Sequence, residues 1–192
     1  MGALPLFLVF GLVVNLHGAS LDDLIEALDT RSPVWQLRRN YENEQGGKKR
    51  MCVRWQKQNV TKEEYQYDYS YKIDNQYVDK GIINATLGTV NQSGVINVTD
   101  IDSGHTILYT LKLWNQTSKC FVLTREVSVG KSVEESVSVG ESVEKRSTEM
   151  VECEVHAWLS KPGQYSSTLC EKEYNETCGN IKFETFSDHD CM

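Results

Sequence analysis

The residues best suited to chemistry in this chain of 192 residues are six cysteines, four of them among its last 40 residues. They follow an apolar N-terminal segment. An even number of cysteines behind such a segment indicates a disulfide framework, because the secretory pathway is oxidising. Six cysteines allow 15 pairings, and spacing alone does not select one. The cysteines are Cys52, Cys120, Cys153, Cys170, Cys178 and Cys191.

The N-terminal segment is apolar from Leu4 to Val14 and ends in the small residues Gly18-Ala19-Ser20. An apolar run of this length is too short to span a bilayer and is typical of a signal peptide. We therefore expect a signal peptide at residues 1–20 and one domain at 21–192. Because no second apolar run of about 18 residues follows, we expect a secreted, extracellular protein without a membrane anchor.

Six Asn-X-Ser/Thr triplets without proline at the middle position agree with secretion. We expect the glycosylated ones to lie in exposed loops or on outward strand faces. The acceptor residues are Asn59, Asn84, Asn91, Asn97, Asn115 and Asn175.

The sequence gives little support for nucleic-acid binding, membrane binding, catalysis or metal binding. A net charge of −7 argues against nucleic acids and anionic membranes as partners. The chain has no Gly-X-Ser-X-Gly elbow, no His-Glu-X-X-His motif and no phosphate-binding glycine loop, so we expect no enzymatic activity and no cofactor. His189-Asp190-Cys191 resembles a metal site only superficially, because Cys191 is expected in a disulfide.

The pattern of apolar residues predicts mainly β-structure. Leu21 to Asp29 has the period of a short amphipathic helix, and Ser167 to Glu176 is a second predicted helix. The segments between them are rich in β-branched and aromatic residues and alternate with turn residues. The predicted strands include 52–55, 65–71, 77–87, 95–98, 106–114, 120–129 and 150–159.

About eight antiparallel strands with a helix at each end fit a closed barrel or a sandwich. Trp55 follows Cys52 too closely for the core tryptophan of an immunoglobulin sandwich, so we favour the barrel. Tyr65, Tyr67, Tyr69 and Tyr71 share one strand face. That face is either a cavity wall or a surface packed against a helix.

Residues 127–146 consist of two ten-residue copies that match at seven positions. Their serine, glycine and charge content predicts an exposed insertion in a late hairpin loop. A partner-binding loop is the alternative interpretation.

Several segments spread over the chain share a pattern with a known family, chiefly in the order of the cysteines around a tryptophan, with the last cysteine close to the C terminus. These segments are Trp35-Gln-Leu-Arg-Arg-Asn-Tyr41, Met51-Cys52-Val53, Asn84-Ala85-Thr86, Ser118-Lys119-Cys120, Cys153-Glu-Val-His-Ala-Trp158, Cys170, Tyr174-Asn-Glu-Thr-Cys178-Gly179 and Asp190-Cys191. Together they resemble the tick salivary lipocalins, often called histamine-binding proteins.

The resemblance implies an eight-stranded antiparallel lipocalin barrel with a short N-terminal helix and a C-terminal helix. It implies the disulfides Cys52–Cys191 and Cys120–Cys170, and with them Cys153–Cys178. Relatives sequester small host mediators such as histamine, serotonin or eicosanoid lipids in the barrel, so we expect a monomer that does the same. The alternative is a pocketless module that binds a host protein such as a complement component.

Amine-binding relatives have an Asp after the mid-chain cysteine and a Glu-Leu-Trp before the C-terminal helix. This chain has Phe121 at the first position and His156 where the Glu is expected, ahead of Trp158. We therefore predict weak histamine binding and a preference for lipid, unless another carboxylate points inward. The candidates for ligand binding are Tyr41, Glu44, Asp79, Phe121, Glu154, His156 and Trp158.

Overall fold

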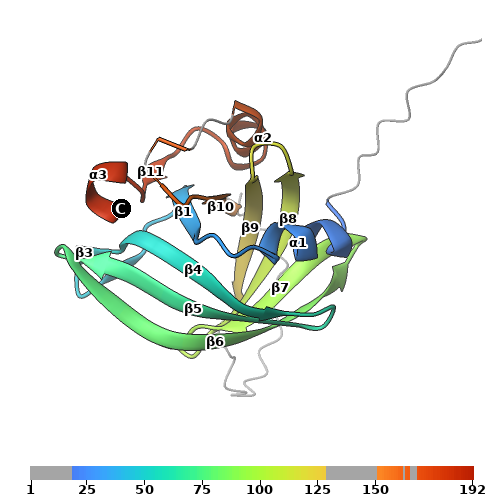
Figure 1. Cartoon of the computed structure of the whole chain (residues 1–192), viewed down its shortest axis with the longest axis horizontal. Helices are drawn as coiled ribbons and strands as arrows, with labels where there is room; N and C mark the ends of the chain where they lie inside the picture. Colours follow the sequence, from blue (N-terminus) through green and yellow to red (C-terminus); the bar gives the residue numbers. More distant parts are fainter. Residues whose placement is uncertain (1–18, 129–150, 162, 165–167) are drawn as a thin grey trace, which may run out of the picture.

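The computed structural model describes residues 19–128, 151–161, 163–164 and 168–192. Residues 1–18 of the expected signal peptide (1–20) and residues 129–146 of the repeat (127–146) lie outside the described residues. Eight long strands form the barrel seen in Figure 1. They are β1 (Val34–Arg39), β4 (Met51–Val60), β5 (Glu64–Ile73), β6 (Gln76–Val90), β7 (Ser93–Thr99), β8 (Thr106–Asn115), β9 (Cys120–Ser128) and β10 (Glu152–Trp158).

Pairing between the first and last strands closes the barrel. Neighbouring strands run antiparallel in the order β10-β9-β8-β7-β6-β5-β4-β1, and β1 pairs again with β10 from Val34↔Trp158 to Arg39↔Glu154. The predicted eight-stranded antiparallel barrel is therefore confirmed. A short hairpin of β2 (Glu44–Gln45) and β3 (Lys48–Lys49) follows β1.

The C-terminal segment fills a gap in the barrel wall. β4 pairs with β1 only at Val34 and Trp35. Farther along β1, Arg38 and Arg39 pair with β11 (Phe183–Glu184) in place of β4. β11 is a short additional strand and is not one of the eight strands that form the ring. The Cys52 N–H then donates to the Thr185 carbonyl over 2.7 Å.

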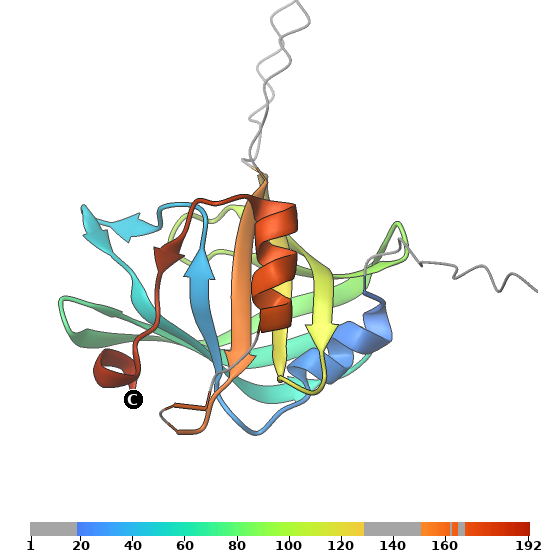
Figure 2. The same ribbon diagram turned by 90° about the horizontal axis from the view of Figure 1, so that it is seen from above.

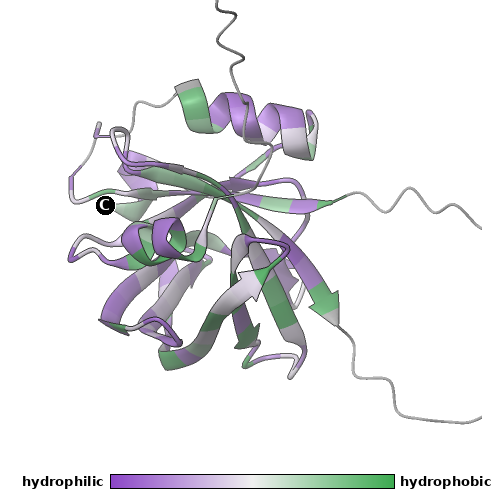
Figure 3. Cartoon of the chain, turned by 90° about the vertical axis from the view of Figure 1, so that its right-hand side faces the viewer, coloured by the Kyte–Doolittle hydropathy of each residue, from purple (hydrophilic) through white to green (hydrophobic). Residues whose placement is uncertain are grey.

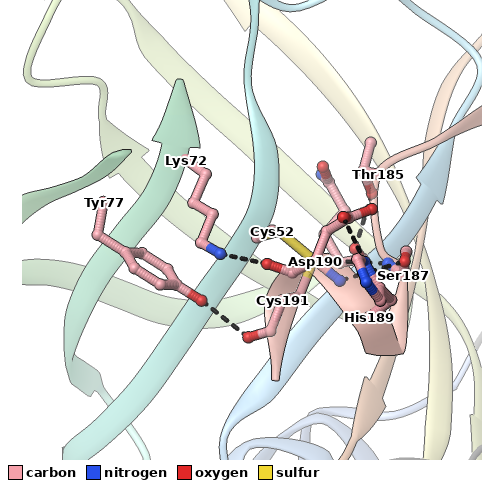
Figure 4. The surroundings of a disulfide bond; sticks show 9 residues. Cys52, Lys72, Tyr77, Thr185, Ser187, His189, Asp190 and Cys191 are labelled. Atoms are coloured by element: carbon pink, nitrogen blue, oxygen red, sulfur yellow. Dashed lines mark hydrogen bonds and ion pairs between the residues drawn. A yellow bond between two sulfur atoms is a disulfide. The ribbon is translucent and has the colours of Figure 1, made fainter. Parts of the chain in front are cut away.

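A disulfide fastens this segment to β4. Cys191, in the short helix α3 (Asp188–Cys191), is bonded to Cys52. Figure 4 shows that two side chains of neighbouring strands also hold the segment: Lys72 donates to the Asp190 carbonyl, and the Tyr77 hydroxyl donates to the Cys191 carbonyl over 2.8 Å.

Alternation along the strands separates two cores. Successive strand side chains point to opposite faces, and hydrophobic and hydrophilic segments accordingly alternate along the strands in Figure 3. On β10, Glu154, His156 and Trp158 face the barrel interior. Cys153 and Ala157 face an outer core beneath the C-terminal segments.

Helix α1 (Leu21–Leu28) covers one end of the barrel. Leu24, Ala27 and Leu28 are fully buried in the interior core. Ser20 caps the helix through reciprocal bonds with Asp23. The Trp158 indole N–H donates to the Ala27 carbonyl over 2.8 Å, so this tryptophan lies at the closed end.

Helix α2 (Thr168–Cys178) lies on the outside of the barrel along β10, as Figure 2 shows from above. Two disulfides tether it, Cys120–Cys170 to β9 and Cys153–Cys178 to β10. All three disulfides join the same cysteines as those that the resemblance implies. Of the six glycosylation acceptors, Asn115 is half-buried and the other five are exposed.

Candidate functional site

A pocket opens at the end of the barrel opposite α1. β7 begins beside α1, where Gly94 N–H donates to the Ala19 carbonyl, and ends at Thr99 in the pocket wall. The cavity itself is small, about 50 Å³, and the wider space of about 600 Å³ around it includes open solvent at the mouth. It is lined by strand residues of the interior face and by the loop at 100–102 that joins β7 to β8.

Aromatic side chains form much of the pocket wall. Trp55, Tyr67 and Tyr109 line it together, and the Trp55 ring lies 5.2 Å from Tyr67 and 6.1 Å from Tyr109 between centroids. Tyr65 stacks on Tyr67 at 4.7 Å, farther from the mouth. Of the four alternating tyrosines on β5, Tyr67 and Tyr69 line the pocket, whereas Tyr65 belongs to the interior core that includes residues of α1, so each interpretation of the sequence holds for part of this face.

The Glu154 carboxylate lies at the base of this pocket and is 1 % exposed. One of its oxygens accepts a hydrogen bond from the Tyr41 hydroxyl. The other lies 2.7 Å from His156 Nε2. Arg125 Nη1 approaches Glu154 Oε1 to 4.0 Å. Glu154 is thus the inward-pointing carboxylate that could replace the missing acidic residues.

Glu154 is ionised at physiological pH. Burial on its own would raise the carboxyl pKa, because desolvation disfavours the charged form. The hydrogen bond and the charge of His156, with the charge of Arg125 and the Tyr41 hydroxyl, outweigh burial and lower the pKa of Glu154 to about 2. The pocket therefore contains a buried carboxylate whose charge is stabilised by cationic and hydrogen-bonding neighbours.

His156 and Phe121 lie beneath the carboxylate. Both are fully buried, and their rings stack at 5.1 Å with an interplanar angle of 8°. The Trp55 ring also lies against the imidazole, with 4.5 Å between the centroids and a tilt of 37°. His156 therefore positions Glu154 from inside the core. Neither His156 nor Phe121 lines the pocket itself.

Arg125 is the main cation of the wall, and its side chain is 13 % exposed. Its Nε lies 2.9 Å from Glu152 Oε2, although the two groups lack the alignment of a hydrogen bond. Its guanidinium stacks on the Tyr41 ring at 4.3 Å. Despite desolvation, the neighbouring Tyr41, Tyr109 and Glu154 raise the pKa of Arg125, which is charged throughout the accessible range.

Carboxylates outnumber cations at the wide mouth above the pocket. Arg50 and Arg125 are its cations, and Arg50 pairs with Asp102 over 2.8 Å. Lys80, on the inner wall, pairs with the same carboxylate over 2.6 Å. The carboxylates of the mouth are Glu42, Glu44, Asp100, Asp102 and Glu152. Their excess gives the entrance a negative potential.

The structure brings together only some of the candidates. Tyr41 and Glu154 line the inner pocket, with His156 and Phe121 beneath them and Trp158 at the closed end. Glu44 and Asp79 do not join them. Glu44 is exposed on the β2–β3 hairpin, where it reaches only the outer mouth. The exposed Asp79 carboxylate accepts from the Gly81 N–H over 2.8 Å outside the barrel.

Several pocket residues were not among the candidates, chiefly Arg125, Trp55, Tyr109 and Lys80. Strand parity was the available signal for Arg125, because it follows Phe121 by four positions on the same face of β9. In the part of the chain that the structure describes, no cluster of three or more His, Cys, Asp or Glu could hold a metal ion. No helix among those residues is long and apolar enough to cross a bilayer.

No protein-family model matches this chain, and no curated protein matches it. The fold and the pocket nevertheless define a class. The chain forms a disulfide-linked, lipocalin-like barrel whose interior pocket is compatible with a small ligand.

Proposed function

We propose that this protein is a secreted relative of the tick salivary lipocalins and sequesters a small host mediator that carries an amino group. Three disulfides are consistent with an extracellular location. The observation that carries the proposal is the buried, ionised Glu154 at the base of an aromatic pocket.

Glu154 supplies what an ammonium group needs in a dry cavity. A buried ammonium without a partner is costly, so a binding site requires an inward carboxylate. An ionised carboxylate has about four acceptor positions. Tyr41 and His156 use one each, so acceptor capacity remains for a ligand. Trp55 and Tyr67 present aromatic faces that attract cations.

The mouth supports the same ligand class. The surplus of carboxylates around the entrance raises the local concentration of cations and steers them inward. The interior beneath Glu154 is filled by Tyr65, Phe121 and His156, each fully buried. The pocket therefore favours a compact ligand over a long chain.

A fatty-acid mediator is the second candidate, and the cations of the wall favour it. Arg125 and Lys80 could pair with a ligand carboxylate, while Ile83, Val98 and Ile107 supply apolar surface. The open pocket with its buried charge supports capture of a small molecule over the alternative of a pocketless module that binds a host protein.

Calorimetry with histamine, serotonin, a leukotriene and a fatty acid tests the proposal. We expect an amine to bind and Glu154→Gln to weaken it by two to three decades, since removing one partner of a buried ion pair costs about 3–5 kcal/mol. Asp79→Asn is the matched control, because Asp79 is exposed and does not line the pocket that Glu154 lines. Lipid binding without amine binding would favour the second candidate.

A further inference from the structure

Arg125 and Glu154 form a buried pair of opposite charges on adjacent strands. Arg125 is on β9 and Glu154 on β10, where Arg125 lies opposite Glu152 and Leu123 opposite Glu154. Their side chains are 13 % and 2 % exposed, and Arg125 Nη1 lies 4.0 Å from Glu154 Oε1. Strand pairing fixes the backbone of both residues at the pocket wall.

This pairing has a consequence for a simple amine. An ammonium in contact with Glu154 would lie close to the Arg125 guanidinium, which has the same charge. Repulsion between the two cations would be comparable to the attraction of either one for Glu154, because all three groups are shielded from water. A ligand with only a positive charge would also add an uncompensated charge to the Arg125–Glu154 pair, which is neutral by itself.

The other charged groups near Arg125 offset only part of this excess. Glu152 forms an ion pair with Arg125 Nε over 2.9 Å, but its side chain is 39 % exposed at the rim, where water weakens the effect of its charge. Asp102 already pairs with both Arg50 and Lys80. An anionic group on the ligand itself could pair with Arg125 while the ammonium pairs with Glu154.

The geometry points to an amphoteric ligand, a compact aromatic molecule that carries an ammonium and a carboxylate a few ångströms apart. This inference rests on the proposed function, because it assumes that Glu154 receives the ammonium. The carboxylate pairs with Arg125, and the aromatic ring lies against Trp55 and Tyr67. A zwitterion leaves the charge balance of the site unchanged, whereas a simple amine or a simple acid alters it.

Ligand pairs that differ only by a carboxylate test this inference on the full secreted chain. The probes are histamine against histidine, tryptamine against tryptophan, and serotonin against 5-hydroxytryptophan. We expect the carboxylated member of at least one pair to bind ten-fold or more tightly than its amine. Arg125→Gln should reverse this order, Arg125→Lys should retain it, and Arg54→Gln, on the outer face over Trp35, should leave it unchanged.

The outcomes separate this inference from the proposed function. If the amines bind as tightly as their carboxylated partners, or if Arg125→Gln leaves the preference intact, the amphoteric ligand is excluded while amine capture stands. If neither member of any pair binds to a protein with native circular dichroism, both the inference and the proposed amine capture fail.

Discussion

His156 Nε2 lies 2.7 Å from Glu154 Oε2, and the two residues are neighbours on the same face of β10. Residues two apart on a strand are separated by about 6.6 Å along the chain, close enough for these side chains to meet. The fully buried imidazole packs against the rings of Trp55 and Phe121. The carboxylate is therefore positioned before any ligand arrives, which reduces the ordering cost of binding.

The interactions of the Glu154 carboxylate with His156, Arg125 and Tyr41 make the free energy of unfolding dependent on pH. The carboxyl has a pKa of about 2 in the folded chain against an ordinary value of 4.5. Its contribution is therefore fully present above pH 4.5 and is lost as the pH falls toward 2. We expect Glu154→Gln to destabilise the protein by about 3 kcal/mol at pH 7, and the difference from wild type to shrink in acid.

Urea denaturation at pH 7, 5 and 3 measures this difference. Asp79→Asn serves as the control, because Asp79 is exposed and does not line the pocket. A gap between wild type and Glu154→Gln that stays constant from pH 5 to pH 3 would contradict the assignment of the low pKa to Glu154.

Gly94 allows α1 to close the barrel. A Cβ at this position would lie 2.7 Å from the Ser20 carbonyl oxygen and 2.8 Å from Leu24 Cβ, so the helix would have to shift. We expect Gly94→Ala to destabilise the protein by about 1–3 kcal/mol. Gly88→Ala is the matched control, because its Cβ would meet only Val95 Cγ2 at an ordinary 3.8 Å. Equal thermal shifts in the two variants would refute this role.

The sequence predicted strands best where one face is buried and the other is exposed. The tyrosines of β5 alternate with polar residues, and the structure places a strand there. β1 was not among the predicted strands, because Val34, Trp35, Gln36 and Leu37 are all buried. Interior contacts cover one face and the C-terminal segments the other, so the period of two disappears.

The candidate site was predicted in part for a similar reason. Strand parity placed Glu154 and His156 on one face, and both face the interior. The same alternation would turn Asp79 inward with Ile83. Gly81, however, has a φ of +72°, and the pairing of β6 with β5 shifts register at this point. The inward and outward faces of β6 are therefore exchanged across the bulge, so that Lys80 and not Asp79 lines the pocket. Gly81 was the only sign of this bulge in the sequence.

The three disulfides should contribute to stability in the order of the loops they close. Their cysteines are 139, 50 and 25 residues apart for Cys52–Cys191, Cys120–Cys170 and Cys153–Cys178. Chain entropy in the unfolded state then gives about 5, 4 and 3.5 kcal/mol. Paired Cys→Ser variants compared by denaturation measure this order. If removal of Cys153–Cys178 caused the largest loss of stability, the anchoring of α2 to the barrel would outweigh the loop entropy.

The tyrosines of the pocket predict the behaviour of the protein in alkali. Burial, reinforced by the charge of Glu154, raises the pKa of Tyr41, Tyr67 and Tyr109 well above 10. Because their pKa is raised in the folded state, these tyrosines stabilise the fold only in their neutral form. Their contribution to the free energy of unfolding is fully present below pH 10 and is lost as the pH rises. Tyr77 is 48 % exposed and should ionise before them.

Absorbance at about 295 nm, recorded with circular dichroism, follows this titration. We expect a small early step from exposed tyrosines and a later cooperative step that coincides with unfolding. Glu154→Gln should narrow the difference in pH between the two steps, because the pocket tyrosines lose a neighbouring negative charge, whereas Glu44→Gln should not. Gradual ionisation of all tyrosines below about pH 11 without loss of structure would contradict the raised pKa values of Tyr41, Tyr67 and Tyr109.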